Sequence, residues 1–119
     1  MKKKIVIKKY GEPENLEIVD CINSYVGNNS VKIAIDGAGV NYADLLIIKG
    51  RYQERPRPPF SPGLEVAGTI IELGSESVKY KVGDKVIAIM KYGGYTQEIV
   101  IPEENVYPIP KNMDILKAA

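Results

Sequence analysis

Short runs of β-branched and aliphatic residues, each ended by a glycine or proline turn signal, dominate this chain. In residues 31–38, Val31, Ile33 and Ile35 alternate with small or polar residues, as in a strand with one buried face. Many short strands with glycine-marked turns are typical of small barrels. We therefore predict a mainly β fold, a partly open β-barrel with one or two short helices. The expected strands span residues 4–10, 16–20, 31–38, 66–73, 85–90 and 95–101.

Residues 41–49 depart from this pattern and predict the main helix. Leu45 and Ile48 have helical spacing, Asn41 suits the N-cap, and Gly50 suits the end of the helix. The remaining expectations are a proline-rich ordered loop at 51–62, an irregular stretch at 103–110, and a last helix of barely one turn at 115–119.

Composition excludes several classes of function. The 119 residues suit one domain, and 26% charged and 45% hydrophobic residues are ordinary globular values. A net charge of +1 provides no overall field to draw nucleic acid or acidic lipid, and no stretch approaches the roughly 18 apolar residues of a membrane span. The single cysteine, Cys21, allows no internal disulfide and favours a reducing cytoplasm. Because the chain has no histidine, His-based acid–base chemistry and most zinc sites are excluded.

Six short motifs follow one another in register along nearly the whole chain. They are Gly39-Val40-Asn41-Tyr42-Ala43-Asp44, Gly50-Arg51-Tyr52, Pro62-Gly63-Leu64-Glu65-Val66-Ala67-Gly68, Gly83-Asp84-Lys85-Val86, Gly93-Gly94-Tyr95-Thr96-Gln97-Glu98 and Pro108-Ile109-Pro110. Together they resemble the N-terminal GroES-like domain of medium-chain dehydrogenases/reductases, with the zinc-free quinone oxidoreductase branch as the nearest match. The resemblance implies a GroES-like domain over residues 1–119, NADPH as cofactor, and a quinone or related conjugated carbonyl as substrate. Enoyl-thioester reductases of the same superfamily share these motifs and are the enzymatic alternative.

The same resemblance bears on metal binding. The family's zinc-dependent members carry a cysteine in the segment that matches residues 41–44, and a histidine just before the glutamate that matches Glu65. Here Leu64 stands at the histidine position and no cysteine lies near Asn41. The four cysteines of the family's structural zinc loop are also missing. We therefore expect no bound metal.

The resemblance assigns Asn41, Asp44 and Tyr52 to the catalytic site, and Asn41 and Tyr42 to the neighbourhood of the cofactor. An amide and a phenol can hydrogen-bond a quinone oxygen, and a carboxylate can orient them. Structural alternatives stand beside each assignment. Asn41 could only cap a helix, Asp44 could be exposed on that helix, Tyr52 could pack against the barrel, and Tyr42 could belong to the core.

Other polar residues receive structural interpretations. Glu65 is expected to hold local backbone or a neighbouring cation, as a satisfied carboxylate. Cys21 lies outside every motif, and we expect it to be buried and inert. Arg51, Arg55 and Arg57 lie among prolines on a loop, where solvated side chains are more common than a phosphate site.

No G-x-G-x-x-G motif follows a strand in this chain, whereas the resembled family holds its dinucleotide on a Rossmann domain with such a turn. We expect the C-terminal Rossmann domain to be absent from residues 1–119. We also expect the chain to be inactive alone, because hydride transfer needs a cofactor held against the substrate. Three interpretations are open: part of a reductase, a stand-alone binding module, or, least favoured, a co-chaperonin. Expected partners are a second copy in a homodimer or a complementing Rossmann-domain chain, which would meet an apolar face that includes Ile115 and Leu116.

Overall fold

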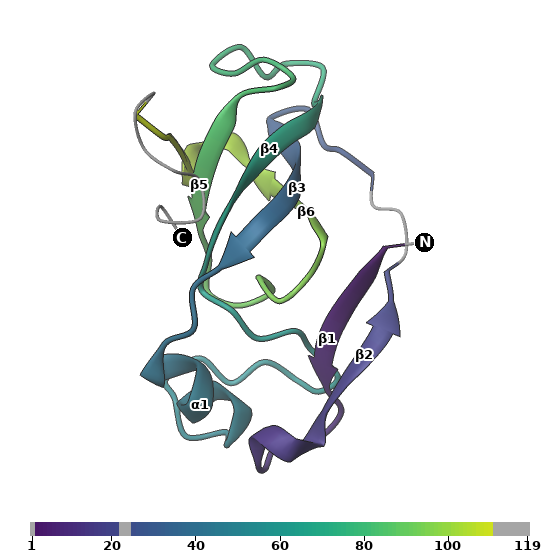
Figure 1. The fold of residues 1–119 in the computed structure, drawn as a ribbon, viewed down its shortest axis with the longest axis vertical. Helices are drawn as coiled ribbons and strands as arrows, with labels where there is room; N and C mark the ends of the chain where they lie inside the picture. Colours follow the sequence, from purple (N-terminus) through teal and green to yellow (C-terminus); the bar gives the residue numbers. More distant parts are fainter. Residues whose placement is uncertain (1, 22–24, 111–119) are drawn as a thin grey trace.

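The computed structural model describes residues 2–21 and 25–110, and its strands form two antiparallel sheets (Figure 1). The small sheet is a hairpin of β1 and β2, and the large sheet has the strand order β6-β3-β4-β5-β7. The elements are β1 (Lys3–Ile7), η1 (Pro13–Asn15), β2 (Leu16–Asp20), β3 (Ser30–Ala38), α1 (Tyr42–Ile48), β4 (Glu65–Leu73), β5 (Lys85–Ile89), β6 (Glu98–Pro102), η2 (Glu103–Asn105) and β7 (Val106–Pro108). The mainly β prediction is confirmed, with one α-helix in the described residues.

The hairpin meets the rest of the chain through a few backbone hydrogen bonds. Ile5 N donates to Tyr95 O over 2.7 Å, and Ile7 N donates to Phe60 O over 2.8 Å. Lys4 and Thr96 form an isolated bridge between the same segments. In the described residues these contacts do not join the two sheets into one continuous ladder, so the sheets remain open rather than closing into a barrel.

Two hydrophobic clusters hold the fold. The sheet cluster lies on one face of the large sheet, where Val31 and Ile33 are fully buried as their alternation predicts. The helix cluster joins β1 to α1 through Ile7, Ile47 and Ile48, with Phe60 from the loop before β4. Burying such side chains stabilises the fold by roughly 1.5–3 kcal/mol each. The helix cluster therefore fixes α1 against the hairpin.

The observed boundaries confirm most expected elements and correct one. β2 spans 16–20 as predicted, and α1 follows Asn41 as its N-cap. Residues 106–108 were expected to be irregular, yet they form β7 along β5. Val106 is buried in the sheet cluster, and that burial outweighs the weak strand signal of a proline-flanked segment. The expected helix at 115–119 lies outside the described residues.

Gly63 and Gly68 flank a segment where the sequence predicts close backbone packing. Gly63 has a φ of +108°, and a β-carbon there would lie 2.7 Å from Tyr95 Cδ1 and 2.9 Å from Gly94 Cα. A β-carbon on Gly68 would lie 2.3 Å from Ala34 O, across the β3–β4 pair. Gly63 is therefore required by its positive φ and its close neighbours, and Gly68 by its close approach to the backbone of β3.

Candidate functional site

The first turn of α1 is built on a buried carboxylate. Asp44, at the third position of the helix, is 1% exposed. Its Oδ2 accepts a hydrogen bond from the backbone N of Asn41 over 2.9 Å and another from the hydroxyl of Tyr95 over 3.0 Å. Asn41 and Asp44 thus have the arrangement of a capping box, which predicts a fixed start for the helix. The alternative in which Asp44 is solvent-exposed is wrong, because Asp44 is buried and its carboxylate is hydrogen-bonded to Tyr95.

The environment of Tyr95 keeps its phenol protonated. Burial raises the pKa of Tyr95 far above its usual value, and the hydrogen bond to the Asp44 carboxylate and the charge of that carboxylate raise it further. Tyr95 therefore acts as a hydrogen-bond donor at any physiological pH. The other carboxylate oxygen, Asp44 Oδ1, is buried and has no hydrogen-bond partner among the described residues.

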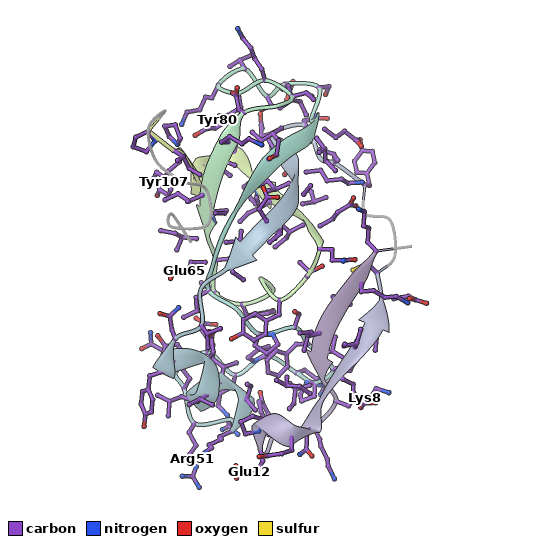
Figure 2. All side chains as sticks on the ribbon, viewed as in Figure 1. Lys8, Glu12, Arg51, Glu65, Tyr80 and Tyr107 are labelled. Atoms are coloured by element: carbon purple, nitrogen blue, oxygen red, sulfur yellow. The ribbon has the colours of Figure 1, made fainter. Side chains whose placement is uncertain are left out.

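The side chain of Asn41 lies between α1 and the start of β4. Its Nδ2 donates to Glu65 Oε1 over 3.5 Å. Gly39 N donates to the backbone O of Glu65 over 3.0 Å, and a β-carbon on Gly39 would lie 2.3 Å from Glu65 Oε1. Figure 2 shows Glu65 at the junction of the large sheet and α1. The carboxylate of Glu65 thus has a side-chain amide as its partner, rather than the backbone group or the cation that was expected.

The two other candidate residues lie apart from this hydrogen-bonded group. Tyr52 is half-buried and packs against the helix cluster rather than against the large sheet. Tyr42 is 74% exposed on the first turn of α1, so the core alternative for Tyr42 is wrong. In the described part of the chain, no hydrogen bond connects either tyrosine to Asn41 or Asp44. The structure therefore brings Asn41 and Asp44 together and adds Tyr95 and Glu65 to them.

An apolar groove of about 630 Å³ runs beside α1. Asp44 and Tyr95 line it, whereas Asn41, Tyr42 and Tyr52 do not. Its walls include apolar side chains from the hairpin, β3, the segment after β3 and α1. Ile18, Val40 and Leu45 are exposed, and Ile5, Leu16 and Ile35 are half-buried. The structure thus has an apolar surface next to the candidate site; Ile115 and Leu116, which were expected to contribute to such a surface, lie outside the described residues.

Tyr95 is the member of this hydrogen-bonded group that sequence reasoning missed. It was recognised only as part of the motif at residues 93–98. The signal that could have found it is the pairing of two glycine motifs: Gly94 N donates to Gly63 O over 3.1 Å, and Tyr95 N donates to Pro62 O over 2.9 Å. These bonds carry Tyr95 to the start of α1. Their geometry depends on contacts between segments about 30 residues apart, which one sequence does not reveal.

Three structural findings concern other expected properties. Within residues 2–21 and 25–110, no three side chains of Asp, Glu, Cys or His are grouped in a way that could hold a metal ion. Over the same part of the chain, no helix has the length and apolar character to cross a membrane. Cys21 is half-buried rather than buried, and its Sγ lies 3.3 Å from Thr96 Oγ1.

Comparisons with known proteins agree with this architecture. Residues 27–111 match the family model described as the alcohol dehydrogenase GroES-like domain. A quinone oxidoreductase-like protein 2 homolog from Nematostella vectensis is 36% identical over 95 residues, which are 79% of this chain and 26% of that protein. The Escherichia coli quinone oxidoreductase, in a structure complexed with NADPH, superposes with a TM-score of 0.91 at 26% identity over 98% of this chain and 36% of that one. A CurK enoyl reductase superposes with a TM-score of 0.88 at 25% identity over 98% of this chain and 38% of that one.

The chain spans about a quarter of the length of the quinone oxidoreductase-like proteins that it matches. The family model nevertheless covers most of the chain, and the motifs, the fold and these comparisons agree. The chain belongs to the alcohol dehydrogenase GroES-like domain family of the medium-chain dehydrogenases/reductases.

Proposed function

We propose that this chain is the substrate-side domain of a zinc-independent, NADPH-dependent quinone oxidoreductase-like protein. In this proposal the dinucleotide is held by a Rossmann domain outside the 119 residues, and the 119 residues alone do not catalyse the reaction. The main support for this proposal is the hydrogen-bonded group formed by Asn41, Asp44 and Tyr95 at the start of α1. It places an amide in the segment, residues 41–44, in which the resembled zinc-dependent members carry a cysteine.

The amide of Asn41 suits the recognition of a carbonyl oxygen. An asparagine NH2 group has two N–H donors. One points toward Glu65 Oε1, which leaves the second for a quinone oxygen. Such a donor stabilises negative charge that develops on the oxygen during reduction, provided that it is held in place beforehand. Asp44 supplies this restraint by binding the backbone N of Asn41, so we assign Asp44 a positioning role.

Tyr52 and Tyr42 complete the proposed site. The phenol of Tyr52, held by packing on the helix cluster, would be a second donor to the acceptor oxygen. Tyr42 is exposed beside Asn41 on the first turn of α1 and would contact the nicotinamide side of the cofactor together with Asn41. When bound, NADPH supplies the hydride. Residues of this chain form only one wall around it, because the chain has no glycine-rich turn for the pyrophosphate.

Three further properties belong to this proposal. The single cysteine and the lack of an internal disulfide support a cytoplasmic setting. Assembly would be with a Rossmann-domain partner, either on the same polypeptide or on a separate chain, or as a homodimer. In this proposal the assembly partner covers the apolar groove beside α1, next to Asp44 and Tyr95.

The test uses the 119-residue chain and a fusion. The fusion joins the chain in frame to the part of the E. coli quinone oxidoreductase that the chain does not cover. Nicotinamide fluorescence measures NADPH binding, and we expect no saturable binding by the chain alone. We expect the fusion to catalyse NADPH-dependent reduction of 1,4-benzoquinone. A fusion that is folded and binds NADPH but reduces no quinone contradicts the proposal. Saturable NADPH binding by the chain alone contradicts its dependence on a second domain.

The likeness to the CurK enoyl reductase supports enoyl-thioester reduction as the second candidate function. Both reactions reduce a conjugated carbonyl, so the same amide could serve either. Assaying the fusion with crotonyl-CoA and with 1,4-benzoquinone at equal concentration separates them through the ratio of kcat/KM values. If the fusion binds NADPH and reduces neither substrate, and if the DNA downstream of codon 119 encodes no Rossmann sequence, the binding-module interpretation is favoured.

A further inference from the structure

A second cavity lies away from the candidate site and has a different chemical character. Its volume is about 430 Å³, and its lining residues include none of Asn41, Asp44, Tyr52 or Glu65. β1 contributes Lys4, β3 contributes Lys32 and β6 contributes Glu98. The cavity also shares Lys4 and Thr96 with the apolar groove, so β1 and its bridge to Thr96 form a common wall. A volume of this size suits a small organic ligand.

Two lysines line this cavity, and their ammonium groups have no hydrogen-bonded partners in the described part of the chain. The side chain of Lys32 is only 13% exposed, and its ion-pair partner Glu72 lies 3.8 Å from Nζ, beyond hydrogen-bond distance. Lys4 takes part in no side-chain hydrogen bond or ion pair among the described residues. A largely desolvated ammonium with an incomplete shell of acceptors is costly, and a ligand anion would supply the missing acceptors.

The remaining charge in the cavity does not cancel the lysines. Glu98 is the one acidic residue in the lining, against Lys4 and Lys32. Two charges outside the lining act on it in opposite senses: Lys2 lies 4.0 Å from the carboxylate of Glu98, and Glu72 lies 3.8 Å from the ammonium of Lys32. With these two included, Lys4 still leaves one positive charge in excess. The cavity is therefore net positive and complementary to an anion.

One side of the cavity is aromatic. Phe60 is buried, and its ring centroid lies 6.0 Å from that of Tyr92 with the planes at 73°, an edge-to-face pair. Both rings line the cavity. Aromatic rings favour stacked or edge contacts with another ring, each worth about 0.5–1.5 kcal/mol beyond area burial. The cavity thus combines an anion-binding side with a wall that suits a planar ring.

We propose that this cavity binds a small aromatic carboxylate, with the carboxylate against Lys4 and Lys32 and the ring against Phe60 and Tyr92. This site is separate from the proposed quinone site, and the inference holds whether or not the chain serves a reductase.

The thiol of Cys21 can be used to measure whether the cavity is occupied. Cys21 lines the cavity and is the single cysteine of the sequence. The hydroxyl of Thr96 donates to the backbone O of Glu98 over 2.9 Å, so the thiol of Cys21 is the donor in its 3.3 Å contact with Thr96 Oγ1. A ligand in the cavity would cover this half-buried thiol. The rate of its alkylation by a neutral reagent, iodoacetamide, therefore measures the empty fraction of the cavity.

The experiment follows iodoacetamide alkylation of the 119-residue chain by mass spectrometry across a series of sodium benzoate concentrations at constant ionic strength. At ten times the dissociation constant, the rate should fall about tenfold, since only the empty fraction reacts. Lys4→Met and Lys32→Met should each lose this protection, whereas Lys79→Met, at an exposed lysine outside the cavity, should keep it. Circular dichroism confirms that each variant is folded, and Lys4→Met carries the test alone if Lys32→Met does not fold.

Two neutral or non-aromatic probes define the ligand class. Benzamide, which has the ring but no charge, and inorganic phosphate, which has the charge but no ring, should protect Cys21 much less than benzoate does. An alkylation rate that is independent of benzoate overturns the proposal, as does protection that survives both lysine substitutions. Equal protection by phosphate and benzoate overturns the aromatic part of the assignment.

Discussion

The hydroxyl of Tyr95 donates a 3.0 Å hydrogen bond to Asp44 Oδ2 and so ties the loop before β6 to the first turn of α1. The same carboxylate oxygen accepts the backbone N–H of Asn41. One buried carboxylate thus joins Asn41, the proposed donor to the acceptor oxygen, to a segment more than 50 residues further along the chain.

The first prediction concerns the stability that this hydrogen bond provides. Tyr95→Phe should lower the free energy of unfolding by about 1–3 kcal/mol, because a buried carboxylate loses one of its two donors. Urea denaturation followed by circular dichroism measures the change. Tyr107→Phe is the matched control: Tyr107 is 48% exposed and its hydroxyl makes no hydrogen bond among the described residues, so its substitution should have an effect below about 0.5 kcal/mol. Equal losses in the two variants would contradict the role given to Tyr95.

The raised pKa of Tyr95 predicts a loss of stability in alkali. An unfolded tyrosine has a pKa of about 10, and the folded pKa of Tyr95 lies above it because of burial and the Asp44 carboxylate. The contribution of this residue is therefore full below pH 10 and falls as pH rises above 10, because the unfolded chain then releases a proton that the folded chain retains. Urea denaturation between pH 9 and 11 should show a shallower decline for Tyr95→Phe than for the unsubstituted chain. Parallel declines would show that other groups dominate.

A surface ion pair predicts how the stability of the hairpin changes at acidic pH. Lys3 and Asp20 form an ion pair across the hairpin, and the hydrogen bond and charge of Lys3 lower the pKa of Asp20. A lowered folded pKa contributes stability that is present above the unfolded pKa and is lost as pH falls. Lys3→Met should therefore raise the pKa of Asp20 toward its ordinary value, as measured by NMR titration of the carboxyl group. Lys8→Met, whose partner is Glu17, should leave the pKa of Asp20 unchanged.

Alanine substitutions at two glycines distinguish the stability cost of a left-handed backbone from the cost of steric contact. Gly63 and Gly83 have φ values of +108° and +99°, but only Gly63 has neighbours that a β-carbon would strike. Gly83→Ala should cost about 1–2 kcal/mol through left-handed backbone alone. Gly63→Ala should cost roughly 1–3 kcal/mol more, because Tyr95 and Gly94 have to move. Thermal or urea unfolding measures both; a smaller loss for Gly63→Ala than for Gly83→Ala would contradict the close packing of the two glycine motifs.

Much of the fold could be predicted from the sequence because its signals are local. The alternation at residues 31–38 and the capping residues of α1 determine elements through neighbouring side chains, and both were predicted correctly. β7 was missed because its stability comes from the exposed edge of β5 and from the burial of Val106, which are properties of the assembled sheet.

The site was predictable only in part for the same reason. Asn41 and Asp44 are three residues apart on one helix turn, so their proximity follows from the sequence. Tyr95 and Glu65 reach them through tertiary packing, and the burial of Asp44 depends on that packing. The roles of Asn41, Asp44, Tyr42 and Tyr52 toward substrate and cofactor remain predictions.

In the proposed function, the amide of Asn41 binds the oxygen of the quinone that accepts the electrons. The most direct measurement of this role is kcat/KM for NADPH-dependent reduction of 1,4-benzoquinone by the fusion described above, with Asn41→Ala compared with Asn29→Ala, an exposed asparagine in the loop before β3. The backbone N–H of residue 41 still binds Asp44 in Asn41→Ala, so the start of α1 is retained. We predict a loss of about 100-fold or more for Asn41→Ala and none for Asn29→Ala. Unchanged kcat/KM in a folded Asn41→Ala fusion would contradict the account.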